Sequence, residues 1–388
     1  MNIVYVSSVM DNEDFRKLFE NCEKIPGQQA QKFHRLMIEG LASNGINVKA
    51  ITGRPITIEN CKKRFLHSSN SKKKMLSYHY CSMINIAGIK VIWQFFTSFF
   101  NVWKELGEKD SSVVIDVLNA SVAYGAATAA RIRKKKCIGI VTDLPHLMVT
   151  GTKKMHVDLV NRVIKKCTEY ILLTEAMNEV VNLQNKPFVI IEGLCDSNMS
   201  LAEKKKEECS SRICMYAGLL DARYGVKNLV EGFILANLTD VQLHIYGDGP
   251  YVPELEAIVK KNNNVLYMGT VMNEEVVEAE LKATLLINPR PTKENFTKYS
   301  FPSKNMEYMV SGTPLVTTKL PGMPKEYYPY VYLFEGETSK DIAKTLRKIM
   351  EKSCDELWNK GESAKKFVLE EKNNIAQALK VINMCERG

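Results

Sequence analysis

Short apolar runs alternate with stretches of helical periodicity along the first half of the chain. Runs rich in Val and Ile are typical of buried parallel strands. They fall at residues 3–6, 48–51, 113–116, 138–141, 170–173 and 188–191. Residues 29–44 carry apolar side chains on one helical face and end at Asn44-Gly45, which predicts a helix. Residues 121–136 predict an Ala-rich helix whose basic carboxyl end suits the helix dipole.

The second half repeats this alternation. Its predicted strands are residues 213–217, 241–246, 265–268, 284–288, 315–317 and 331–333. Helical patterns lie between them, for example at residues 226–237. Two rounds of strand and helix predict an α/β protein with two Rossmann-like doubly wound domains facing a cleft. We expect an N-terminal domain at 1–194, a C-terminal domain at 195–365, and a final helix at 366–388 that packs back on the first domain.

Composition fits a soluble two-domain protein. The chain has 388 residues, 45% of them hydrophobic and 25% charged. Its ten cysteines are scattered singly without metal-ligand spacing, so we expect reduced thiols, a cytoplasmic location and no metal site. No secretory signal is visible at the start. The most apolar stretch, residues 84–103, contains Lys90 and Gln94 and is not typical of a membrane span.

Positive charge is concentrated in the first half. Residues 1–194 contain 27 Lys and Arg against 17 Asp and Glu, whereas the rest of the chain is almost neutral. Basic clusters at 62–64, 72–74 and 131–136 favour either an anionic partner or an ordinary solvated surface. An anionic membrane face or a pyrophosphate fits better than nucleic acid, because no nucleic-acid-binding motif accompanies the clusters. The aromatic run at 93–103 is typical of a core helix, with membrane docking as the alternative.

The most informative segment is residues 288–326. Pro302 and Ser303 are helix-start signals, and the free amides of a helix start bind phosphate. Lys304 adds a positive charge there, and Glu307, one turn further, could accept hydrogen bonds from a ribose diol. An ordinary capped helix is the alternative interpretation.

This segment resembles the family-four retaining glycosyltransferases of the GT-B fold (group 1). The match covers Glu307 and the small-Gly-x-Pro turn that ends the helix at Gly312. Residues 299–304 resemble a variant found among bacterial surface-polysaccharide transferases. The family has a pair of Glu residues here, and the first of them falls at the position of Tyr299, so the usual contact to the donor sugar is altered; Glu294 could replace it.

The resemblance implies further site residues. A strand–Gly–loop–cation arrangement follows at 216–229, and a Gly-x-Gly-Pro turn follows at 247–250. In the first half, the turn before the first long helix would approach the donor, beside a loop at 10–25 that could act as a lid. The expected donor-binding residues are Gly27, Gln28, Gly218, Arg223, Lys227, Gly247, Gly249, Arg290, Ser303, Lys304 and Glu307. The expected catalytic residues are Asp143, His146, Arg223 and Lys304.

Asp143 ends a buried strand where relatives carry a polar residue near the reacting centre. It could position the acceptor or accept its proton, with His146 as a second candidate. The alternative is a turn Asp and a surface His.

The resemblance therefore implies metal-independent transfer of a hexose, with retention, from a nucleoside-diphosphate sugar to a glycan or lipid-linked glycan in polysaccharide biosynthesis. A UDP-sugar is favoured over a GDP-sugar as donor, and no cofactor is expected. Peripheral contact with the inner membrane face would follow from the basic first half. Two alternatives stay open: an inactive partner or chaperone subunit, suggested by Leu219, Tyr224 and Tyr299 at usually charged positions, and a sugar-nucleotide epimerase.

Overall fold

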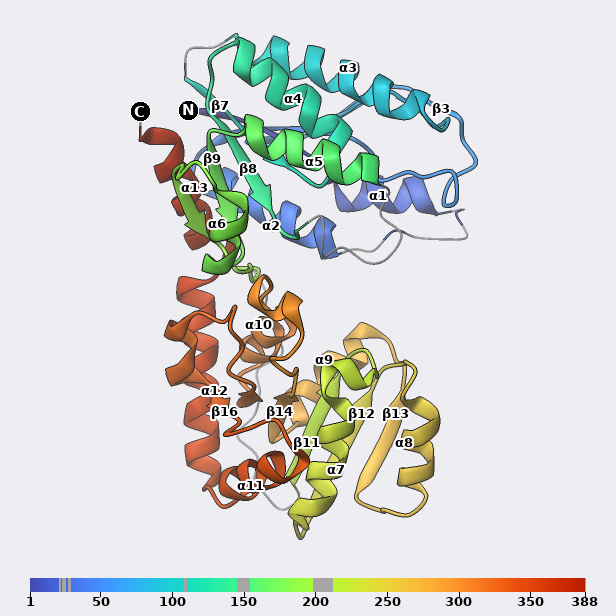
Figure 1. The fold of residues 1–388 in the computed structure, drawn as a ribbon, viewed down its shortest axis with the longest axis vertical. Coiled ribbons are helices and arrows are strands. Elements are labelled where there is room, and N and C mark those ends of the chain that lie inside the picture. Colours follow the sequence, from blue (N-terminus) through green and yellow to red (C-terminus); the bar gives the residue numbers. More distant parts are fainter. Residues whose placement is uncertain are drawn as a thin grey trace. The chain divides into compact units, whose positions relative to one another are not determined.

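The computed structural model describes residues 1–20, 22, 26, 29–107, 110–144, 154–197 and 212–387. The chain divides into two compact units, each built on its own sheet (Figure 1). The N-terminal unit comprises Met1–Asp196 and Asn373–Gly388, and the C-terminal unit comprises Ser197–Lys372. Each unit has its own hydrophobic core.

The N-terminal unit contains a sheet in the order β10-β9-β8-β7-β1-β2-β5-β4. Its strands are β1 (Asn2–Ser7), β2 (Asn47–Thr52), β4 (Ser69–Lys73), β5 (Leu76–Tyr80), β7 (Ser111–Asp116), β8 (Cys137–Val141), β9 (Glu169–Leu172) and β10 (Phe188–Ile190). Only the edge pair β4–β5 is antiparallel. A separate antiparallel pair joins β3 (Phe65–Leu66) to β6 (Met83–Ile84). The sequence pattern did not predict the strands between residues 65 and 84.

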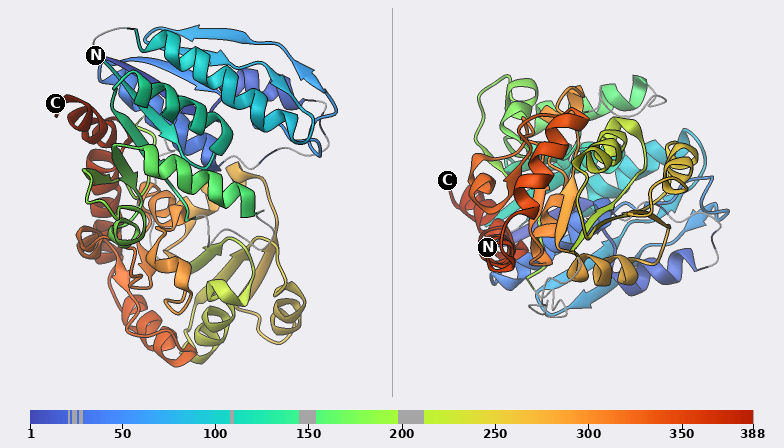
Figure 2. Two further views of the ribbon diagram at one scale, coloured as in Figure 1. Left: turned by 45° about the horizontal axis from the view of Figure 1, so that its top comes forward. Right: turned by 90° about the horizontal axis from the view of Figure 1, so that it is seen from below.

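Helices cover both faces of this sheet (Figure 2). They are α1 (Asn12–Phe19), α2 (Gln29–Ser43), α3 (Ile89–Glu105), α4 (Ala120–Ile132), α5 (Lys154–Lys166), α6 (Glu175–Val181) and α13 (Asn374–Glu386). Side chains of α1, α2 and α13 share one core with the sheet. On the other face, α3 packs along α4, and α4 packs along α5. Right-handed crossovers account for this division.

The expected lid at residues 10–25 is wrong for its central part, which is the helix α1. Asp11 caps this helix by accepting a hydrogen bond from the Glu13 amide at 3.1 Å. Phe15 and Phe19, one turn apart, are buried in the core. The capping residue and the apolar spacing were the signals for a helix, but polar neighbours obscured them.

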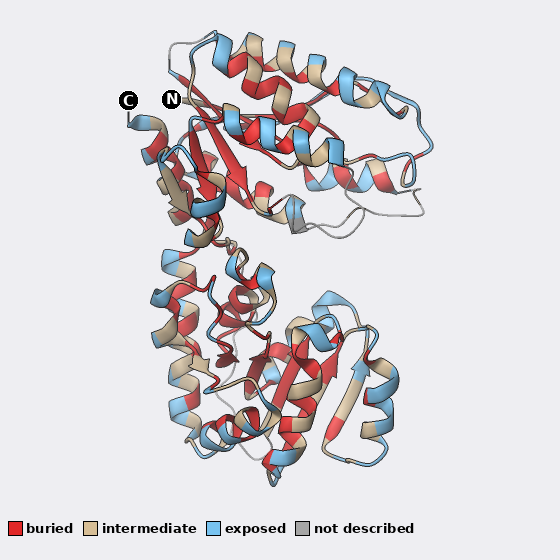
Figure 3. Ribbon diagram, viewed as in Figure 1, coloured by how far each residue is buried: buried red, intermediate tan, exposed pale blue. Residues whose placement is uncertain are grey.

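The C-terminal unit contains an entirely parallel sheet in the order β13-β12-β11-β14-β15-β16. Its strands are β11 (Arg212–Ala217), β12 (Val241–Tyr246), β13 (Val265–Gly269), β14 (Leu285–Asn288), β15 (Leu315–Thr317) and β16 (Tyr332–Leu333). Its helices are α7 (Val226–Ala236), α8 (Val252–Val259), α9 (Asn273–Lys282), α10 (Ser303–Val310), α11 (Ser339–Met350) and α12 (Cys354–Glu371), with 3-10 turns η1 (Ala222–Tyr224), η2 (Asn295–Lys298) and η3 (Lys325–Tyr330). Figure 3 shows the central strands of both units as mostly buried. The prediction of two doubly wound α/β sheets is confirmed.

Two expectations about the whole chain can be compared with the described residues. Eight of the described cysteines are free thiols, but Cys354 is disulfide-bonded. The expectation of ten reduced thiols is therefore wrong for Cys354. None of the described helices has the length and apolar character needed to cross a membrane.

Candidate active site

The start of α10 lies at the carboxyl end of the C-terminal sheet. Pro302 occupies the cap position, Ser303 begins the helix and is exposed, and Lys304 is half-exposed. The Nζ of Lys304 lies 3.6 Å from the Glu307 carboxylate. The first amides of a helix have no intrahelical acceptor and attract anions. The exposed Ser303 and the ammonium group of Lys304 at this helix end form a site suited to phosphate.

Buried polar residues hold this helix in place. Asn305 is fully buried, and its Oδ1 accepts a hydrogen bond from Asn288 Nδ2 at 2.6 Å, while its Nδ2 lies 3.4 Å from Thr317 Oγ1. Asn288 ends β14 and Thr317 ends β15, so α10 is fixed to both strands. The sequence pattern did not predict these residues. The available signal was Asn305, which interrupts an otherwise apolar helix face.

Tyr308 provides a third attachment. Its hydroxyl accepts from the Ala217 amide at 2.9 Å and donates to the Ala217 carbonyl at 3.1 Å. Ala217 is the last residue of β11. The start of α10 is therefore fixed relative to the loop that leaves β11, which contains Gly218.

The loops after β11 and β12 are in backbone contact. Gly247 has φ 127°, and a Cβ there would lie 1.9 Å from the Gly218 carbonyl oxygen. The Leu220 amide donates to the Asp248 carbonyl at 2.9 Å, and a Cβ on Gly249 would lie 2.4 Å from the Leu220 oxygen. Side chains at Gly247 and Gly249 would therefore push these loops apart. The structure brings Gly218, Gly247 and Gly249 together and gives their small size a structural reason.

Arg223 lies in η1 at the edge of this region. Its side chain is 69% exposed and forms a two-point contact with Asp221, Nη2 to Oδ2 at 2.7 Å and Nε to Oδ2 at 3.1 Å. The guanidinium lowers the pKa of the Asp221 carboxyl. The charge of Glu294, on the loop after β14, also acts on Arg223. An incoming anion would compete with Asp221 for this cation.

Arg290, two residues after β14, is the least satisfied cation in the region. Its guanidinium carbon lies 4.9 Å from the ring centre of Tyr224 and 5.6 Å from that of Phe296. Burial lowers its pKa. Among the described residues, none accepts a hydrogen bond from its buried Nε, and no carboxylate forms an ion pair with it. A desolvated cation without a counter-ion is costly, and a bound anion removes that cost.

Lys227 has a different environment. Its Nζ forms an exposed ion pair with Glu254 at 2.8 Å, which links α7 to α8. The predicted contact between Lys227 and the donor would therefore have to break this ion pair with Glu254.

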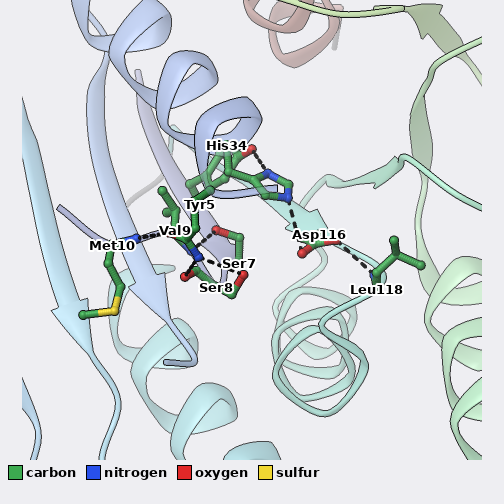
Figure 4. Close-up of polar contacts among 9 residues, drawn as sticks. Tyr5, Ser7, Ser8, Val9, Met10, His34, Asp116 and Leu118 are labelled. Atoms are coloured by element: carbon green, nitrogen blue, oxygen red, sulfur yellow. Dashed lines mark hydrogen bonds and ion pairs between the residues drawn. The ribbon is translucent and has the colours of Figure 1, made fainter. Parts of the chain in front are cut away.

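In the N-terminal unit, a buried polar chain links β1, α2 and the carboxyl end of β7 (Figure 4). The Tyr5 hydroxyl lies 2.7 Å from His34 Nδ1, and His34 Nε2 lies 3.3 Å from Asp116 Oδ2. The Leu118 amide donates to Asp116 Oδ1 at 3.0 Å. One proton arrangement satisfies all partners: Tyr5 donates to Nδ1, and Nε2–H donates to the carboxylate. Sequence reasoning missed this chain, because its members lie far apart in the sequence.

Asp143 follows β8, the neighbour of β7 in the sheet. Its side chain is open to solvent, yet partial desolvation by the surrounding protein and the negative charge of Asp116 raise its pKa. A carboxyl whose pKa is raised is better suited to exchange protons near neutral pH. The other predicted residues of this unit, Gly27, Gln28 and His146, lie outside the described residues.

Comparisons with known proteins agree with this geometry. Residues 211–352 match the family described as "Glycosyl transferases group 1". Sucrose-phosphate synthase from Thermosynechococcus elongatus is similar over 99% of this chain and 98% of its own, with a TM-score of 0.62 and 15% identity. S. aureus TarM in a complex containing UDP is similar over 100% of both chains, with a TM-score of 0.61 and 12% identity. Anabaena HepE in complex with UDP is similar over 99% of both chains, with a TM-score of 0.60 and 12% identity. No curated protein sequence matches the chain significantly.

The structural likeness shows the GT-B fold over the full length, and the family match places the group 1 domain on the C-terminal unit. The chain therefore combines a GT-B fold with a C-terminal unit that matches the group 1 glycosyltransferase family.

Proposed function

We propose that the protein transfers a hexose from a UDP-sugar to a hydroxyl group of a glycan or lipid-linked glycan, with retention and without a metal ion. The reaction would serve polysaccharide biosynthesis at the cytoplasmic face of the membrane. The observation that carries this proposal is the partly desolvated Arg290, to which no described residue supplies a counter-ion, together with the anion-attracting start of α10.

The leaving diphosphate gains negative charge as the glycosidic bond breaks. Cations and amides already in place stabilise that charge without reorganising. In the proposed reaction Arg290, Lys304 and the first amides of α10 bind the diphosphate, and Arg223 exchanges Asp221 for a phosphate oxygen. Glu307 binds the ribose, and the Gly218, Gly247 and Gly249 loops contact the nucleotide.

The acceptor hydroxyl loses its proton during transfer. No nucleophilic side chain is assigned, so the acceptor would attack from the face that the diphosphate leaves. Asp143 is proposed to orient this hydroxyl or to accept its proton, because a raised pKa makes its carboxylate a stronger base than that of an ordinary Asp.

A thermal-shift series with UDP, UDP-sugars and GDP-sugars tests the proposal. A donor at about 100 times its Kd should stabilise the protein by about 2.7 kcal/mol. Lys304→Ala should remove most of this shift, and the matched surface variant Lys282→Ala on α9 should keep it. Turnover should survive EDTA. An unchanged donor response in Lys304→Ala would show that its assigned role is wrong, and donor conversion without acceptor would identify an epimerase.

A further inference from the structure

Helix α3 has its apolar and polar faces reversed relative to an ordinary surface helix. A surface helix of a globular protein normally turns its apolar face to the core. In α3, the buried positions include Gln94 and Ser98. Ser98 Oγ donates to the Val122 carbonyl at 2.8 Å, and Ser121 Oγ donates to Gln94 Oε1 at 2.8 Å. The helix is therefore held against α4 partly by polar contacts.

The opposite side of α3 carries an exposed apolar stripe. Its members are Ile89, Ile92, Trp93, Phe96 and Phe100, each between 40% and 63% exposed. Their spacing of three, four, seven and eleven residues from the first places them on one helical face. The expectation that the aromatic run at 93–103 is core is therefore wrong for Trp93, Phe96 and Phe100. Exposed apolar surface of this extent marks an interaction site.

The exposed apolar surface continues from α3 onto residues 56–66, which lie beside the amino end of this helix. Asn85, just before α3, donates from its side chain to the Cys61 carbonyl at 3.1 Å, and its amide donates to the Arg64 carbonyl at 2.7 Å. The Nζ of Lys90 donates to the Ile56 carbonyl. These bonds fix residues 56–66 beside the amino end of α3. Ile58 and Phe65, 59% and 65% exposed, extend the apolar surface there.

Cations lie at both ends of the stripe. Lys62, Lys63 and Arg64 are exposed at the amino end, beside the single exposed acid Glu59 among residues 56–66. At the other end, the Arg133 guanidinium lies 4.1 Å from the Trp103 ring centre. Its exposed neighbours in the same cluster are Arg131 and Lys134, and Lys104 is exposed on α3 itself.

A small apolar groove of about 230 Å³ borders the stripe. Val91, Ile92 and Phe95 of α3 line it together with residues of α4 and α5. On α5, exposed Met155 and the exposed cations Lys154 and Arg162 extend the same combination of apolar and positive groups.

We infer that the α3 stripe, with its flanking cations, docks onto an anionic lipid surface. Aromatic side chains partition into the membrane interface, and Lys and Arg beside them attract anionic headgroups. A second copy of the chain fits less well, because a symmetric contact through the stripe would bring the cationic clusters of both copies together. The inference depends on the proposed function in one respect: docking would bring the active site to a lipid-linked acceptor.

Vesicle co-sedimentation tests this inference. We expect binding to vesicles that contain phosphatidylglycerol, weaker binding to phosphatidylcholine alone, and loss of binding at high salt. The double variant Phe96→Ser/Phe100→Ser should reduce binding about tenfold or more. Leu183→Ser, which removes an 82% exposed Leu elsewhere, is the matched control and should bind as before.

Two further readouts separate the possible outcomes. In a Trp103→Phe/Trp358→Phe background, Trp93 is the remaining tryptophan, and its emission should shift to the blue on vesicle binding. Sedimentation velocity without lipid should give the same species for parent and double variant. Unchanged vesicle binding in the double variant, or dissociation of a dimer by it, would overturn the inference. The donor-induced thermal shift should be unaffected, so failure of docking and failure of the proposed transfer are distinguishable.

Discussion

A Cβ atom on Gly225 would lie 2.1 Å from the carbonyl oxygen of Pro289. Gly225 joins η1 to α7 with φ 82°, and Pro289 directly follows β14. The close approach of these two backbones sets their neighbours, Tyr224 and Arg290, beside each other. This position therefore requires a glycine for two reasons: its left-handed backbone conformation and the lack of space for a Cβ atom.

Gly225→Ala should destabilise the protein by about 2–4 kcal/mol, the sum of left-handed strain and steric displacement. Gly45→Ala is the matched control, because Gly45 has φ 80° but a Cβ added to it would meet no atom within 4 Å. It should cost only about 1 kcal/mol. Urea unfolding of both variants measures the difference. Equal costs would show that the Pro289 contact carries no energy.

Arg290→Met should weaken UDP binding about tenfold or more, because a charge-assisted phosphate contact is lost. The unliganded protein should keep its Tm or gain stability, since the variant no longer desolvates a cation to which no described residue supplies a counter-ion. Calorimetry with UDP and thermal unfolding measure the two effects. Lys282→Met on α9 should change neither. Full UDP affinity in Arg290→Met would remove this residue from the site.

The sequence pattern located the strands that are buried on both faces, because such strands are continuous apolar runs. It failed at β4, whose residues Ser69–Lys73 are polar and mostly exposed. This edge strand exists through its pairing with β5, and local pattern carries little information about an edge. It failed again at α3, where exposed aromatics imitate a core helix.

For the candidate site, the sequence indicated which residue types would surround a phosphate, but not which hydrogen-bond and ion-pair partners each of them has in the fold. Arg223 and Arg290 were both predicted to bind the donor, yet Arg223 is paired with Asp221, whereas Arg290 is stacked on Tyr224. The burial of each arginine and the residues that contact it depend on segments that are distant in the sequence and meet only in the folded protein. The buried pair Asn288 and Asn305 was not predicted for the same reason.

Tyr308→Phe should destabilise the C-terminal unit by about 1–3 kcal/mol, because the Ala217 amide and carbonyl lose their buried partner. Donor affinity should fall as well, since the start of α10 is no longer fixed to the end of β11. Tyr328→Phe, at a partly exposed tyrosine of the same unit, is the control and should change neither quantity. A stability loss with unaltered donor affinity would show that this attachment does not position the site.

Asp143→Asn should raise stability at neutral pH while lowering kcat. The folded protein raises the pKa of Asp143, so the folded state binds the proton more tightly than the unfolded state. Wild-type stability from this group is present below the ordinary Asp pKa of about 3.9 and is lost as pH rises through the raised folded pKa. The Asn variant has no such loss, so the two unfolding curves should coincide in acid, diverge between about pH 3.9 and the folded pKa, and keep a constant offset above it. Because Asp116 contributes to the shift, Asp116→Asn should reduce the divergence. Parallel pH–stability curves for wild type and Asp143→Asn would contradict the raised pKa, and an unchanged kcat would contradict the proposed handling of the acceptor proton.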